Sequence, residues 1–174
     1  MAQNASARKY NASHLSSTKN YQVQETNWFE VKIGNVADDL TFLTQSCTLP
    51  ESSNPAIDVG FGNSTAKVAG KREYGEGTIV FMDAMVVDVE KQILAWQKQV
   101  YDPKTGKMGW VSDYKRDVFI TQYGPDGTYE RQWHLEGAWP SAVSYGEMSG
   151  ESADKKVISV TLTYDNAYRD DLDY

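Results

Sequence analysis

The stretch Val157-Ile-Ser-Val-Thr-Leu-Thr-Tyr164 alternates large apolar side chains with small polar ones. Its apolar members are Ile158, Val160, Leu162 and Tyr164. Successive side chains of a β-strand point to opposite faces. This alternation therefore predicts a strand that buries one face and turns Ser159, Thr161 and Thr163 away from the core.

A second alternating stretch, Asn27-Trp-Phe-Glu-Val-Lys-Ile33, lies near the start of the chain. A polar turn at 34–39 leads from it to the apolar stretch 40–46, so the two stretches together predict a hairpin. Further segments rich in β-branched and aromatic residues predict strands at about 65–70, 78–82, 117–123 and 129–135. A turn, Gly124-Pro-Asp-Gly127, joins the last two of these strands, and a short segment follows from Trp139 to Tyr145.

Residues 88–101 show the one clear helical pattern in the sequence. Their apolar residues recur at spacings of four, three and four and form a single stripe: Val89, Ile93, Trp96 and Val100. Asp88 can cap the first turn, and Pro103 ends the helix. Together these elements predict a mainly β fold, a small β-barrel or sandwich with the stripe of one flanking helix packed on it.

The connection between residues 50 and 65 is too long for a hairpin turn. Ile57, Val59 and Phe61 alternate within it, so an extended chain would present them on one side. A free loop gains nothing from such a stripe. We therefore expect an extended segment that packs against something, with Asn63 and the neighbouring glycines letting the chain turn back.

The chain has 174 residues, a length that suits one domain. Residues 1–20 are rich in Asn, Ser and Ala without periodicity, so we expect a flexible N-terminal arm at 1–20 and one domain at 21–174. The net charge is −7, and because residues 1–20 contribute +3, the rest carries −10. Such an acidic body disfavours tight binding to phosphate backbones. Neither a secretion signal nor a membrane-spanning apolar run is found, so no membrane anchor is expected.

Residues that could act in catalysis or bind a metal occur singly in this sequence, not in a cluster. His14 lies in the N-terminal arm, His134 stands alone on a predicted strand, and Cys47 is the single cysteine. We interpret His134 as a solvated or interface residue and Cys47 as a buried structural thiol. No enzyme activity, metal or cofactor is therefore expected, and residues 165–174 are interpreted as an acidic tail.

Several motifs resemble tail tube proteins of contractile-tailed bacteriophages, and they occur in the same order along the chain. They are Trp28-Phe-Glu-Val-Lys-Ile33, Cys47-Thr-Leu-Pro50, Val59-Gly-Phe-Gly-Asn63, Val68-Ala-Gly70, the helix with Trp96, Gly137-Ala-Trp-Pro140 and the strand 157–164. Each motif is modest alone, whereas the common order is fairly specific. The resemblance covers about residues 27–165.

The resemblance implies a structural subunit of a hexameric ring, whose inner strands join into one barrel around a lumen. Rings would stack into the inner tube of the virion tail and conduct double-stranded DNA during infection, after synthesis in the bacterial host cytoplasm. Implied partners are further copies of the chain and the sheath, baseplate, tape-measure and tail terminator proteins, with DNA in non-specific transit. In this setting the expected ring-stacking residues are Ile57, Val59, Phe61 and Asn63.

Other functions share part of this pattern. A tube subunit of a secretion system or of an extracellular contractile injection system would have the same fold, and so would a baseplate protein that initiates the tube. Outside this class, a small-ligand-binding barrel would be a monomer with an enclosed apolar pocket. For the long connection, the alternative to stacking is that its apolar stripe covers its own barrel.

Overall fold

The computed structural model describes residues 24–34, 39–125, 127, 130–151 and 154–170, so the arm expected at 1–20 lies outside the described residues. The strands are β1 (Phe29–Ile33), β2 (Thr44–Cys47), β3 (Ser52–Ser53), β4 (Ala56–Phe61), β5 (Ser64–Ala69), β6 (Glu73–Tyr74), β7 (Gly77–Met82), β8 (Tyr101–Asp102), β9 (Lys107–Met108), β10 (Arg116–Tyr123), β11 (Glu130–Ser144), β12 (Val157–Thr163) and β13 (Asn166–Arg169). The helices are α2 (Asp39–Phe42), α3 (Val89–Val100) and α4 (Val111–Tyr114).

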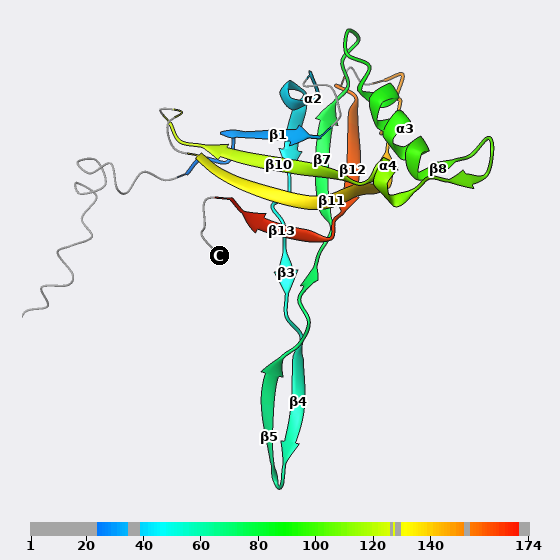
Figure 1. The fold of residues 1–174 in the computed structure, drawn as a ribbon. Coiled ribbons are helices and arrows are strands. Elements are labelled where there is room, and N and C mark those ends of the chain that lie inside the picture. The colour runs from blue at the N-terminus through cyan, green and yellow to red at the C-terminus, as the bar shows by residue number, and fades with distance from the viewer. Residues whose placement is uncertain (1–23, 35–38, 126, 128–129, 152–153, 171–174) are drawn as a thin grey trace, which may run out of the picture.

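A seven-stranded sheet forms the body of the molecule, in the order β1-β10-β11-β12-β7-β2, with β13 also paired to β11. All of these pairings are antiparallel. Figure 1 shows β1, β10, β11 and β13 crossing β12, β7 and β2 nearly at right angles. We call the first four strands the first layer and the other three the second layer. The predicted mainly β fold with a flanking helix is confirmed.

Strand β11 is 15 residues long and belongs to both layers. Its first half pairs with β10 and β13, and its second half pairs with β12. Near the point where β11 passes from the first layer to the second, Gly137 has φ +65°, a left-handed conformation that glycine adopts without strain. The register with β12 then shifts between Pro140 and Ala142, and such a bulge tolerates a proline that has no N–H to donate.

The core lies where the inward faces of the two layers meet α3. In the first layer Ile33, Val118, Leu135 and Ala167 stand opposite one another on four successive strands. The second layer contributes buried side chains from two strands: Ile79, Phe81, Ile158, Val160 and Leu162. Burial of a side chain of this size stabilises the fold by roughly 1.5–3 kcal/mol relative to exposure.

The hairpin expected from residues 27–46 is wrong. Strand β1 pairs with β10 in the first layer, whereas β2 pairs with β7 in the second. Between them α2 forms a helical turn that buries Leu40 and exposes Phe42. Alternate residues do not share a face in a helical turn, so the apolar pattern at the start of 40–46 does not mark a strand.

Two other segments form strands that the sequence pattern does not predict. Residues 102–113 contain β9, which pairs with β8 as a short hairpin. The acidic tail expected at 165–174 begins with β13, which continues the pairing of β12 along β11. Asp165 N donates to Glu136 O at 3.0 Å at the junction, and Ala167 is buried in the core. The polar composition of this segment conceals the burial of Ala167.

The long connection at 50–65 contains two strands, β3 and β4. Strand β4 pairs with β5 along its whole length through the two-residue turn Gly62–Asn63, where Gly62 has φ +59°. The shorter pair β3–β6 joins this hairpin to the body. Figure 1 shows the hairpin extending far from the two layers. We call residues 48–76 the hairpin arm.

Candidate assembly surfaces

The side of the first layer that faces away from the core is polar. One row of side chains crosses its four strands, because registered partners share a face: Lys32, Phe119, His134 and Tyr168. The rings of Phe119 and His134 stack with centroids 4.4 Å apart. We call this surface the polar face, and it also contains Glu30, Asp117, Thr121, Gln132, Glu136, Asn166 and Asp170.

Hydrogen bonds join the polar face across its strands. The Tyr168 hydroxyl lies 2.8 Å from His134 Nδ1 and donates to Glu136 Oε1 at 3.1 Å. Asn166 Nδ2 donates to Glu136 Oε2 at 3.1 Å, and the Tyr74 hydroxyl donates to Asn166 Oδ1 at 2.6 Å. Desolvation raises the pKa of Tyr168, and its bond to Glu136 raises it further. The phenol therefore stays protonated and acts as a donor that stiffens this face.

Acidic groups dominate the charge of the polar face. Among the side chains that the structure describes, its carboxylates are Glu30, Asp117, Glu136 and Asp170, against the single lysine Lys32. His134 Nε2 lies 3.7 Å from Asp117 Oδ2, and His134 Nδ1 lies 3.9 Å from Asp170 Oδ1. Within the described part of the chain, no three His, Cys, Asp or Glu side chains are grouped as a metal ion requires. The face can accept hydrogen bonds and repel anions.

Cys47 closes β2 and is half-buried. Burial raises the pKa of its thiol to about 11. The thiolate, which is the nucleophilic form, is therefore scarce at neutral pH.

Both edges of the first layer are unpaired among the described residues. Strand β1 pairs only with β10, and β13 pairs only with β11. Unpaired edges present free N–H and C=O groups and favour pairing with another chain. Strand directions alternate across the layer, so β13 runs antiparallel to β1. A second copy can therefore place its β1 beside β13 and continue the antiparallel sheet without a break.

The hairpin arm carries the expected stacking residues on one face. That face consists of Ile57, Val59, Phe61, Ala66 and Val68. Ile57 is 52% exposed and Phe61 is 65% exposed, while Asn63 lies in the turn beside Gly62. The alternative in which this stripe covers its own barrel is therefore wrong. The stripe is available to another molecule.

Helix α3 closes the other side of the core with its apolar stripe. Val89, Ile93 and Trp96 are buried, and Val100 at the last turn is half-buried. The Asp88 side chain accepts a hydrogen bond from Lys91 N at 2.9 Å and so caps the first turn. The helix begins and ends within one residue of the range that the sequence predicts.

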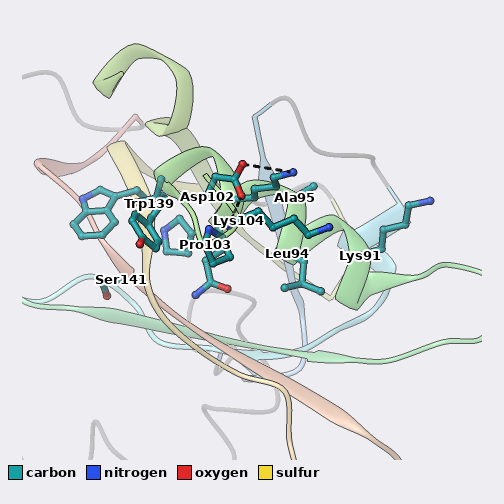
Figure 2. A pocket seen from close by; sticks show the side chains of 13 residues that line it. Lys91, Leu94, Ala95, Asp102, Pro103, Lys104, Trp139 and Ser141 are labelled. Carbon is teal, nitrogen blue, oxygen red and sulfur yellow. Dashed lines mark hydrogen bonds and ion pairs between the residues drawn. The ribbon is translucent and has the colours of Figure 1, made fainter. Parts of the chain in front are cut away.

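A groove runs along the exposed side of α3. It has a volume of about 650 Å³ and is lined by residues of the helix, of the β8–β9 turn and of β11. Figure 2 shows Lys91, Leu94 and Ala95 along the helix and Trp139 and Ser141 across from them. The groove lies on the outer surface, whereas core side chains fill the space between the layers. This arrangement does not match the enclosed pocket of a small-ligand-binding barrel.

Sequence reasoning missed two of these surfaces. The polar face draws on four strands that are far apart in the chain, and a single sequence carries no signal of their pairing. The unpaired edge of β13 was hidden because residues 165–174 look like a solvated tail. The alternation of Ala167 with Asn166 and Tyr168 is the pattern that could have revealed a strand there.

Unpaired edges, a polar face and an exposed apolar arm define a structural assembly protein. The chain belongs to the phage tail tube protein family, whose model matches residues 11–169. It is thus a structural tail tube protein, and its relatives are structural tail tube proteins, not enzymes.

Individual relatives agree with this placement. The chain is 28% identical to tail tube protein gp19 of Enterobacteria phage T4 over 144 residues, which are 80% of this chain and 87% of the relative. Its identity to gp19 of Enterobacteria phage T6 is 27% over the same length. Its fold is similar to a chain of the PVC sheath–tube complex, an extracellular contractile injection system, with a TM-score of 0.68 and 16% identity over 92% of this chain and 97% of that one. A chain of the PVC sheath/tube terminator has a TM-score of 0.69 at 17% identity, covering 87% of this chain and 99% of that one.

Proposed function

We propose that copies of this chain form a hexameric ring in which the first layers join into one continuous β-barrel. The observation that carries this proposal is that the edges of β1 and β13 run antiparallel to each other and pair with no other described strand. Pairing of β13 with the β1 of the next copy is a heterologous contact, and such contacts close into a ring when the rotation permits. Closure would satisfy both edges at once.

In such a ring the polar face would line the lumen, because it is the side of the first layer opposite the core. The tube would conduct double-stranded DNA during infection. The carboxylates of Glu30, Asp117, Glu136 and Asp170 would repel the phosphates, so DNA would pass without being held. Hydrogen bonds within this face leave few donors for the DNA backbone.

The other surfaces support stacking and an outer covering. The hairpin arm would contact a copy in the adjacent ring through Ile57, Val59 and Phe61, with Asn63 at its tip. Helix α3 lies across the core from the polar face and would face outward, toward a sheath. Baseplate, tape-measure and tail terminator proteins are the remaining proposed partners, and synthesis would take place in the host cytoplasm. No helix among the described residues is long and apolar enough to cross a membrane.

Electron microscopy and sedimentation of the purified protein test the proposal. Rings that polymerise into tubes at high concentration are the expected result. A monomer at every concentration, with no rings in the images, would contradict it. A baseplate initiator would instead form rings that never elongate alone. Genome neighbours separate the remaining alternatives, because terminase and capsid genes indicate a phage tail and their absence indicates a secretion or injection tube.

A further inference from the structure

The end of the body opposite the hairpin arm exposes large apolar side chains. Phe42 closes α2, and Met85 and Val86 lie in the loop between β7 and α3. All three side chains are largely or fully exposed. We call Phe42, Met85 and Val86 the apolar end. Exposed apolar side chains that gather at one end of a fold commonly mark an interaction surface.

The topology fixes this placement. Strands β2 and β7 are antiparallel neighbours, and the hairpin arm leaves after Cys47 and returns at Gly77. The opposite ends of the same two strands lead to α2 and to the loop that holds Met85 and Val86. Met82 N donates to Leu43 O at 2.8 Å, which brings these two segments together. Figure 1 shows α2 and this loop at one end of the molecule and the hairpin at the other.

We propose that the apolar end is the docking surface for the hairpin arm of a copy in the adjacent ring. The inference rests on the proposed tube function and names the surface that receives the arm. Two different apolar surfaces at opposite ends make a heterologous contact, which repeats from ring to ring without limit. A single self-complementary patch would stop at a pair of rings. Met85 also suits an aromatic partner such as Phe61, because its thioether is flexible and polarisable.

Both surfaces are held in defined positions before they meet. At the root of the arm the rings of Tyr74 and Tyr164 lie 6.0 Å apart, and the Tyr74 hydroxyl is bonded to Asn166. At the apolar end Asp83 N donates to Lys156 O at 3.0 Å, and Lys156 Nζ lies 2.9 Å from Asp83 Oδ2. Preorganised surfaces lose less conformational freedom on contact, which favours association.

Three double variants test the proposal. The arm variant carries Ile57→Ser and Phe61→Ser, and the end variant carries Met85→Ser and Val86→Ser. A matched control removes exposed apolar groups elsewhere, with Met108→Ser in β9 and Val111→Ser in α4. We expect all three variants to have the same melting temperature as the parent protein when unfolding is followed by circular dichroism. The arm and end variants should form single rings that do not elongate, whereas the control should form normal tubes.

Mixing preformed rings of the arm and end variants gives the decisive measurement. An arm-variant ring keeps a competent apolar end, and an end-variant ring keeps competent arms. The mixture should therefore give stacks of two rings in electron micrographs and nothing longer. Normal tubes from the end variant, or a mixture without two-ring stacks, would overturn the proposal. An arm variant that folds but makes no rings would also overturn the proposal, because the arm would then act in ring closure and not in stacking. Failure of the parent protein to form rings is a different result, and it removes the proposed function itself.

Discussion

Trp96 links helix α3 to the sheet through three kinds of contact. Its side chain is 1% exposed, and its Nε1–H donates to the carbonyl oxygen of Tyr114 at 2.7 Å. The guanidinium of Arg116, at the start of β10, lies 5.0 Å from its ring centroid. Packing, a hydrogen bond and a cation–π contact thus act at one residue.

Replacing Trp96 with alanine should lower the free energy of unfolding by ~3–5 kcal/mol, as for other large buried aromatic residues. Urea unfolding followed by circular dichroism measures the change. Trp110→Ala is the matched control, because that side chain is 81% exposed and its loss should change stability by less than ~0.5 kcal/mol. Equal effects of the two substitutions would show that the stripe of α3 is not part of the core.

The two tryptophans also show how far a sequence predicts single residues. Trp96 belongs to a stripe with helical spacing, so its burial can be predicted from the chain alone. Trp110 lies in an irregular segment, where nothing local distinguishes an exposed side chain from a buried one. His134 is similar: its neighbours Phe119 and Tyr168 come from other strands, and only their register brings the three rings together.

Strand β11 is the element that makes the fold, because it connects the two layers. The sequence predicts two separate segments, at 129–135 and at 139–145, since Gly137 and Pro140 usually interrupt strands. The structure uses these residues to bend one continuous strand. Propensity rules treat glycine and proline as the ends of strands. The strand continues through the bend because it pairs with other strands, and that pairing cannot be seen in the local sequence.

Substitution of Gly137 by alanine should destabilise the protein by ~1–3 kcal/mol. Its φ of +65° disfavours any side chain, and a Cβ would lie 2.5 Å from Asp165 Oδ2, the carboxylate that contacts Lys115. Gly60→Ala in β4 is the control, because that position has no atom within 4 Å of an added Cβ. Thermal melts of both variants measure the difference. A Gly137→Ala protein that melts with the parent would mean that the bend does not depend on a left-handed residue.

At the scale of the whole molecule, the fold class follows from local patterns but the surfaces do not. Alternation along 157–164 and the stripe of α3 identify strands and a helix, because each depends on neighbours in the chain. The polar face and the unpaired edges depend on which strands pair. The net charge of −10 outside residues 1–20 predicts an acidic body, and only the topology shows that four carboxylates share the face of the first layer.

That distribution of charge leads to a prediction about DNA. Assembled tubes of the parent protein should not hold double-stranded DNA, because the proposed lumen repels phosphates. Asp117→Lys would place one new cation per copy on the polar face, repeated around every ring. DNA retention should then appear, and it should weaken steeply as salt rises, since each phosphate contact releases condensed counterions.

Asp113→Lys is the matched control, because it makes the same charge change on exposed α4, beside α3. Filter binding of labelled DNA to tubes at two salt concentrations measures retention. Equal DNA binding by the two variants would place Asp117 outside the lumen, and tight, salt-sensitive binding by the parent tubes would contradict a conduit through which DNA moves freely.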